Sequence, residues 1–197
     1  MRRRLTAVLL CAALVGFGLG GCGTDRAARS ADTTVTAAVQ ADGKHNDTDV
    51  MYLQMMVAHH EQGLEMVRLA ADRAKRAEVR TLAAAVDVTQ ADEVKLMESW
   101  LEGWSAPTTV DHAPSAHADH GGLPATGPDE MAALRKAKGA KFETTFLNLF
   151  VAHQHNAVEM AAMEQKGGEN AEAKAFAGRV KASRTDQIAQ MLRLLNG

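Results

Sequence analysis

Apolar residues recur at intervals of three and four along most of this chain, a spacing that places them on one face of a helix. The pattern predicts four helical stretches, at about residues 48–74, 77–104, 129–166 and 171–195. Between the second and third stretches, residues 105–128 show no such period and contain all four prolines, as a linker does. The expected fold class is therefore all-α, with two helical hairpins joined by a long linker.

Single residues indicate where these helices should begin and end. Asn46 and Asp47 belong to the types that cap a helix start, and Asn170 can cap the last helix. Gly139 is expected to bend or split the third stretch. Gly167-Gly168 should form the turn between the third and fourth stretches.

The two hairpins are copies of one another. Sliding the chain by 94 positions aligns them without a gap, and most matches fall at apolar positions that shared core packing explains. Two matches do not: His59 falls on His153, and Glu65 falls on Glu159. Hairpins with one apolar face each bury those faces against each other, which predicts a four-helix bundle with one long crossover. In such a bundle the two first helices can bring His59 and His153 together.

The beginning of the chain has the pattern of an export signal. Residues 1–21 start with three arginines and continue with an apolar run too short to span a bilayer comfortably. They end before Cys22, which resembles the lipid-modified residue of a bacterial lipoprotein; the alternative is an ordinary secretory signal with a chance cysteine. Residues 22–47 are expected to form a flexible tether to the membrane, followed by the hairpins at 48–104 and 129–197.

Charge and cysteine content narrow the possible partners. Removal of the signal changes the formal net charge from -2 to -5, which argues against nucleic acid as a partner. The second cysteine, Cys11, leaves with the signal, so the exported chain should have no internal disulfide. Its stability must then come from an apolar core or from a metal.

Methionine and histidine share one face of the first helical stretch. At 100° per residue, Met56, His59 and Met66 lie along that face, and His153 and Met160 lie similarly in the second copy. Thioether sulfur suits Cu(I) and imidazole suits copper, zinc and iron, so the mixed set favours copper. The alternative is that these methionines and histidines are core residues, since Met fills gaps well.

Further candidate groups adjoin this face. His60 follows His59 directly, and His155 lies four residues before Glu159. Glu65 and Glu159 either orient the imidazoles or are solvated acids. The linker adds three histidines that either collect ions loosely or are incidental: His112, His117 and His120.

Several enzyme classes are excluded by missing motifs. No Glu-x-x-His pair suits a di-iron bundle, and neither a His-Glu-x-x-His zinc motif nor a Gly-rich phosphate loop is present. A binding role without turnover is therefore expected. The alternatives are a copper or iron oxidase on the same bundle and a structural or interaction module of the cell envelope.

The pattern D-x-x-Y-x-x-x-M-x-x-H-H at residues 49–60, with the later Q-x-x-E-x-x-x-M-x-x-W-L-x-x-W at 90–104, resembles the domain-of-unknown-function family 305. The resemblance implies a ferritin-like four-helix fold, export to the cell envelope and metal binding through Met and His, with copper implicated for some members. The family usually repeats Met and His-His in the second half, where this chain has Phe150 and a Gln at position 154. We therefore expect one half-site in the first hairpin, supported in part by the second.

Overall fold

A computed structural model describes Ala41, residues 43–109 and residues 126–197, all of which belong to the unit 37–197. The expected signal, the lipid-bearing cysteine and the linker histidines lie outside the described residues.

The domain has four long helices, which the apolar pattern predicts, and one short one. They are α1 (Asp47–Arg73), α2 (Ala77–Gly103), α3 (Pro128–Lys136), α4 (Gly139–Gly167) and α5 (Ala171–Asn196). The third predicted stretch is split into α3 and α4, and the all-α expectation is confirmed.

The predicted capping residues and Gly139 lie at the ends of the helices. The Asn46 side chain accepts a hydrogen bond from the Asp49 N–H, and the Asp49 carboxylate accepts one from the Asn46 N–H, which forms a capping box at α1. Asn170 caps α5 through the N–H of Ala173. Gly139 has a φ of +56°, a conformation that costs glycine little, and this turn of the backbone separates α3 from α4.

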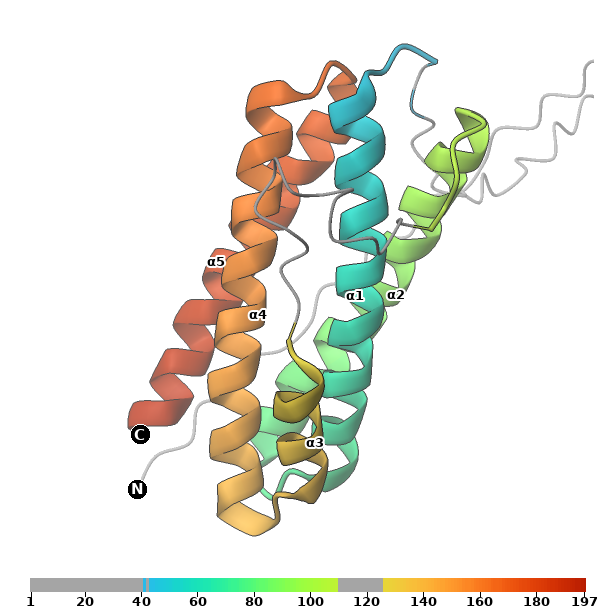
Figure 1. The fold of residues 1–197 in the computed structure, drawn as a ribbon. Coiled ribbons are helices and arrows are strands. Elements are labelled where there is room, and N and C mark those ends of the chain that lie inside the picture. Colours follow the sequence, from blue (N-terminus) through green and yellow to red (C-terminus); the bar gives the residue numbers. More distant parts are fainter. Residues whose placement is uncertain (1–40, 42, 110–125) are drawn as a thin grey trace, which may run out of the picture. The chain divides into compact units, whose positions relative to one another are not determined.

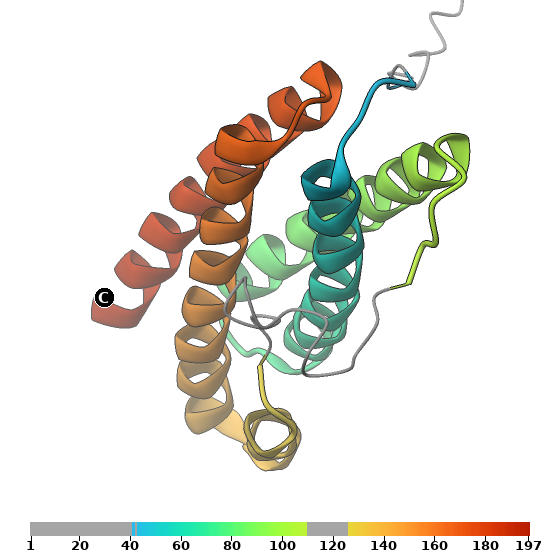
Figure 2. The ribbon, with the colours of Figure 1, turned by 45° about the horizontal axis from the view of Figure 1, so that its top comes forward.

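The helices pack as two antiparallel hairpins, α1 with α2 and α4 with α5 (Figure 1). The first helices of the two hairpins, α1 and α4, make the main contact between them, and the short α3 lies against α4. Figure 2 shows the two hairpins side by side, with α1 and α4 on the inside. This pairing is the one that the internal repeat predicts.

Two buried carboxylates join the hairpins in a way that repeats the 94-residue relation. Asp49 of α1 accepts hydrogen bonds from the backbone N–H groups of Glu169 and Asn170, in the turn between α4 and α5. Glu143 of α4 accepts hydrogen bonds from the N–H groups of residues 75–76, in the turn between α1 and α2. Each first helix thus anchors the turn of the other hairpin, which fixes the level of α1 against α4.

The described ends of the linker are fastened to α1. The Gln54 side chain donates a hydrogen bond to the Pro107 carbonyl at 2.7 Å. Gln62 exchanges two hydrogen bonds with the backbone of Thr126, at 2.7 and 2.9 Å. Both attachments are on α1, so the described ends of the crossover are tied to the first hairpin.

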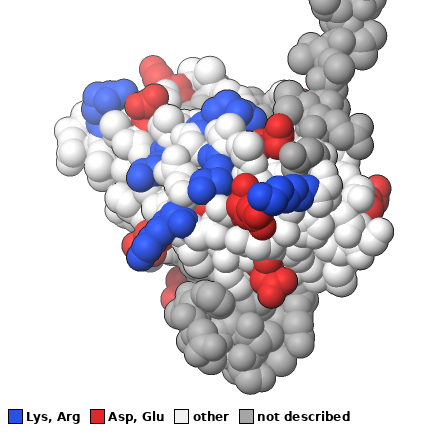
Figure 3. Space-filling view, turned by 90° about the horizontal axis from the view of Figure 1, so that it is seen from above, with Lys and Arg blue, Asp and Glu red and all other residues white. Residues whose placement is uncertain are grey.

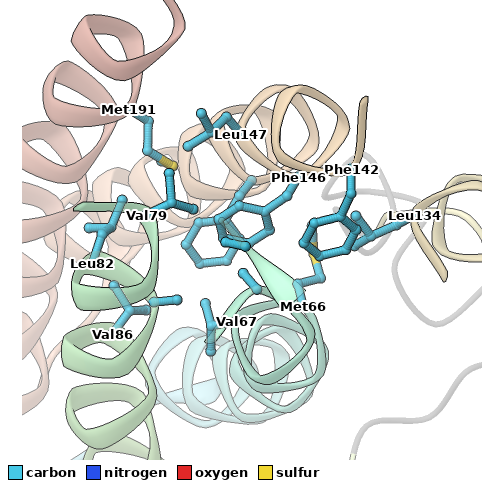
Figure 4. Close-up of a cluster of buried hydrophobic side chains, with 14 of the residues drawn as sticks. Met66, Val67, Val79, Leu82, Val86, Leu134, Phe142, Phe146, Leu147 and Met191 are labelled. Carbon is cyan, nitrogen blue, oxygen red and sulfur yellow. The ribbon is translucent and has the colours of Figure 1, made fainter. Parts of the chain in front are cut away.

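The apolar core consists of two clusters rather than one continuous column. Figure 4 shows the first cluster, in which side chains from all five helices meet. The second lies toward the other end of the bundle and contains much of the methionine. Met97 and Met191 are completely buried in these clusters. The level between the clusters is occupied by polar side chains.

One end of the described domain carries mixed charge on its surface. Figure 3 shows the end of the domain at the top of Figure 1, where lysine and arginine side chains alternate with aspartate and glutamate. No helix in the described part of the chain is long and apolar enough to cross a membrane.

Candidate metal centre

A layer of buried or largely buried polar side chains crosses the bundle between the two apolar clusters. Every long helix contributes to it, at the point where the apolar stripe of that helix is interrupted. Buried polar groups that lack partners are costly, so such a layer calls for an explanation. The polar layer consists of His59 and His60 of α1, Gln90 and Glu93 of α2, His153 and Gln154 of α4, and Arg184 and Gln187 of α5.

The two histidines that the repeat pairs do meet in this layer. The rings of His59 and His153 are stacked, with centroids 3.6 Å apart and planes inclined by 16°. Nε2 of His59 lies 3.0 Å from the backbone oxygen of His153. Because a carbonyl oxygen only accepts, Nε2 of His59 carries the proton and Nδ1 keeps its lone pair. That Nδ1 is buried and has no hydrogen-bond partner.

His60 is held by a charged pair from the second helices of the two hairpins. Its Nε2 lies 2.8 Å from Oε2 of Glu93 and 3.1 Å from Nη2 of Arg184. Arg184 is fully buried and also donates to the same Glu93 oxygen. In the tautomer that donates from Nε2 to the Glu93 carboxylate, Nδ1, which has no partner, is the bare nitrogen. A carboxylate that orients an imidazole in this way is typical of metal-binding histidines.

Burial keeps all three imidazoles of the layer neutral near pH 7. It lowers the pKa of His153 to about 3, with the nearby His60 and Arg184 adding to the effect. Burial also holds the pKa of His59 well below 6.5, and the neighbouring histidines reinforce this. For His60, burial outweighs the hydrogen bond to Glu93, and the pKa is again lowered. Neutral imidazoles have a lone pair to offer, and a metal does not have to displace a proton from them.

Unpartnered polar atoms gather beside a glycine of α1. Both ring nitrogens of His153 and both amide atoms of Gln90 are buried without hydrogen-bond partners. They adjoin Gly63, where an added Cβ would lie 2.6 Å from Oε1 of Gln90 and 2.8 Å from Nε2 of His153. The missing side chain at Gly63 thus leaves room for two polar groups that have nothing else to bind.

Gly63→Ala is expected to destabilise the protein by about 1–3 kcal/mol, because the added methyl group overlaps His153 and Gln90. Alanine stabilises a helix by about 1 kcal/mol relative to glycine. A net loss of stability would therefore have to come from the overlap with His153 and Gln90. Gly178→Ala in α5 is the matched control, since its Cβ would meet only the end of the Gln165 side chain, at 3.2 Å. Urea unfolding of both variants checks the prediction, and equal stabilisation by the two would contradict it.

The predicted methionines lie on both sides of the polar layer. Met56 and Met160 are buried in the second apolar cluster, one turn or two along their helices from the histidines. Met66 lies in the first cluster, near Phe142 and Leu134 in Figure 4, and its sulfur is 3.9 Å from the hydroxyl of Thr126. The helix thus places Met56 and Met66 at opposite ends of the His59–Gly63 segment.

Three other predicted residues point out of the bundle. His155, Glu65 and Glu159 are exposed, and Glu65 forms an ion pair with Arg135 of α3. In the described residues, no three His, Cys, Asp or Glu side chains are grouped so that they could hold a metal ion. Any metal in the polar layer would therefore need thioether or amide groups beside the imidazoles.

The repeat shows how the second half of the layer differs from the first. His60 and Glu93 correspond to Gln154 and Gln187, and this second pair is also joined by a hydrogen bond. The geometry of the pair is kept, but the imidazole and carboxylate have been replaced by amides. The second hairpin therefore contributes one imidazole, His153, to the layer.

Sequence reasoning gave no role to Gln90, Glu93 or Arg184. A signal was present, because Gln90 and Glu93 occupy stripe positions between the apolar Val86 and Met97, at spacings of three and four. A polar residue on an apolar stripe indicates a buried polar contact. Shifted by 94 residues, Gln90 corresponds to Arg184, which interrupts the apolar stripe of the last helix in the same way.

Solved structures of other proteins share this fold. A candidate secreted protein, DUF305, from Streptomyces coelicolor is 28% identical, with a TM-score of 0.68, and the match covers 76% of this chain and 92% of that one. A DUF305 fragment from Deinococcus radiodurans is 24% identical, with a TM-score of 0.67 and coverage of 80% and 98%. CopM in its Cu(I)-bound form is 23% identical, with a TM-score of 0.64 and coverage of 75% and 95%.

CopM has also been solved in Cu(II)-bound and silver-bound forms, and those structures match this chain with similar scores. At this level of identity the similarity shows a common fold. No curated protein matches the chain in sequence. The sequence pattern described as domain of unknown function, DUF305, matches residues 49–195, and the chain therefore belongs to the DUF305 family.

Proposed function

We propose that this protein binds copper in the polar layer and serves to sequester or buffer it outside the cytoplasm. The observation that carries the proposal is a set of three buried, neutral imidazoles in one layer, with no hydrogen-bond partner at Nδ1 of His59, at Nδ1 of His60 or at either nitrogen of His153. The hydrogen bond of His59 to the His153 carbonyl and the contact of His60 with the Glu93 carboxylate hold these two rings in place. A role in storage needs no open position for a substrate.

The chemistry of the neighbouring groups fits copper better than harder metals. The carboxylate of the layer, Glu93, is engaged with His60 and Arg184. Besides the amides of the layer, the uncharged donors closest along the helices are the thioethers of Met56 and Met160, which are soft and suit copper. Zinc and iron prefer a larger number of nitrogen and oxygen ligands. The described residues contain no group of three His, Cys, Asp or Glu side chains that could supply them.

Two findings support the proposal from outside the layer. CopM, which shares the fold, has been solved with copper and with silver bound. The beginning of the chain has the pattern of a lipoprotein signal, and we propose that Cys22 anchors the protein to the outer face of the cell membrane. Met66 and the exposed His155 remain predicted ligands, with Glu65 and Glu159 as predicted outer partners.

The test is thermal unfolding of the metal-free protein with Cu(I), Cu(II), Ag(I) or Zn(II) added. A ligand at 100 times its dissociation constant stabilises the folded state by about 2.7 kcal/mol, which raises the melting temperature by several degrees. We expect that rise with Cu(I), and we expect it to vanish in His59→Ala/His60→Ala.

A second variant separates the polar layer from loose binding elsewhere. His112→Ala/His117→Ala/His120→Ala removes the linker histidines, and the copper-induced rise should survive in it. Circular dichroism establishes that each variant is helical before metal is added. If no metal raises the melting temperature of the unaltered protein, the histidines are core residues and the copper proposal fails.

A further inference from the structure

Arg184 places a permanent positive charge inside the polar layer. It is the one lysine or arginine among the described residues that is buried, and its side chain is completely inaccessible. Its guanidinium contacts Glu93, Nε2 of His60 at 3.1 Å and the Ser183 hydroxyl at 3.2 Å. A charge this deep is screened little by solvent, so it acts on any ion that enters the layer.

The repeat shows that helix packing does not require an arginine at this level. The position that corresponds to Arg184 in the first hairpin is Gln90, which is equally buried. The position that corresponds to Glu93 is Gln187, another amide. One half of the layer is therefore built from neutral side chains, and the other half carries an ion pair. Because both halves pack at the same level of the bundle, the charges call for an explanation beyond packing.

The balance of charge in the layer decides which ions it can hold. The three imidazoles are neutral, and Glu93 and Arg184 cancel, so the layer has no net charge before an ion binds. Burial raises the pKa of Glu93, but the contacts with His60 and Arg184 outweigh it, and the carboxylate stays ionised. A monovalent ion then leaves one uncompensated charge and a divalent ion leaves two. Attraction to Glu93 and repulsion from Arg184 both double in the second case, so without Arg184 the layer would favour the divalent ion.

We propose that Arg184 makes the polar layer selective for monovalent soft cations, Cu(I) and Ag(I), over divalent ions. This inference rests on the proposed copper-binding function and names the oxidation state of its ligand. Glu93 and Arg184 act through charge, and they need not touch the ion. The second hairpin contributes Arg184 and no carboxylate to the layer, so it cannot compensate a second positive charge.

A charge series in the purified protein tests the inference. Arg184→Gln copies the residue of the first hairpin and gives the layer a net charge of -1. Glu93→Gln copies the residue of the second hairpin and gives it +1. Dissociation constants for Ag(I), as a redox-stable monovalent probe, and for Zn(II), as a divalent probe, are measured by competition against indicator dyes. The quantity of interest is the ratio of the two constants in each variant.

We expect Arg184→Gln to shift that ratio by about tenfold or more toward Zn(II), and Glu93→Gln to shift it the other way. Arg184→Lys keeps the charge and should keep the ratio of the unaltered protein within about threefold. If Arg184→Gln does not fold, Glu93→Gln and Arg184→Lys still decide the question. A ratio that does not follow the layer charge overturns the inference, whereas unaltered protein that binds no Ag(I) overturns the proposed function instead.

Discussion

Replacement of Glu164 by glutamine is expected to raise the free energy of unfolding at pH 7 by about 3 kcal/mol. Glu164 is completely buried in α4, beside the Asp49 carboxylate and the close approach of Gly168. No donor reaches either of its carboxyl oxygens. Burial, together with the hydrogen bond and the charge of Asp49, raises the pKa of Glu164 to about 8. The folded protein therefore holds a proton that the unfolded chain releases.

The sign of the effect follows from the two pKa values. The Glu164 carboxyl titrates near 4.5 in the unfolded chain and near 8 in the folded protein. Its contribution is intact below pH 4.5 and is lost as pH rises to 8. A glutamine amide can donate to Asp49 and has no proton to lose. The gain from Glu164→Gln should therefore be close to zero at pH 4.5, about 3 kcal/mol at pH 7 and about 5 kcal/mol above pH 8.

Urea unfolding at pH 5, 6, 7 and 8 measures this dependence on pH. Glu159→Gln is the matched control, because Glu159 lies on the same helix but is exposed. The control should leave stability nearly unchanged at every pH. A gain for Glu164→Gln that is constant across the range would show that the side chain is not protonated in the folded state.

The fold could be predicted because its determinants are local or repeated. The three- and four-residue period gave the helices, the caps at Asn46 and Asn170 gave two of their starts, and Gly139 gave the division of α3 from α4. The repeat then indicated that α1 and α4 pack together, which brings His59 onto His153. Each step needed only the geometry of a single helix or of two equivalent ones.

The partners of the histidines could not be predicted in the same way. Glu93 and Arg184 reach His60 from α2 and α5, and their approach depends on how those helices are rotated and shifted in the bundle. Glu65 lies six residues after His59, about 240° around the helix, and so points to solvent. His155 is turned about 200° from His153 for the same reason. Spacing along one helix thus identified the buried face but not what meets it.

In the Glu164→Gln background, metal-free protein is expected to lose at least about 2 kcal/mol of stability when the pH falls from 6.5 to 5. His153 takes up a proton near pH 6.5 in the unfolded chain, but burial and the charges nearby lower its folded pKa to about 3. Its contribution is present above pH 6.5 and is lost as pH falls toward 3. His59, whose pKa is also held well below 6.5, adds a loss in the same direction.

The background variant is needed because Glu164 hides the effect. Between pH 6.5 and 5 the folded protein keeps the Glu164 proton while the unfolded chain does not, so a falling pH stabilises the protein through that group. The two changes are of similar size and opposite sign. Three carboxyls have lowered pKa values: Asp49, Glu93 and Glu143. Their contribution to the stability of the protein is lost only below about pH 4.5, outside the range from pH 6.5 to 5.

Adding His153→Gln to that background assigns the loss to one ring. Glutamine has no proton to gain in this range, so about 2 kcal/mol of the difference between pH 6.5 and 5 should disappear. Urea unfolding of the two variants at both pH values gives the comparison. An unchanged difference would mean that His153 can accept a proton inside the bundle, and the polar layer would then tolerate positive charge more readily than its burial indicates. That result would also weaken the electrostatic reason for selectivity at Arg184, because both depend on how strongly the same layer resists a second charge.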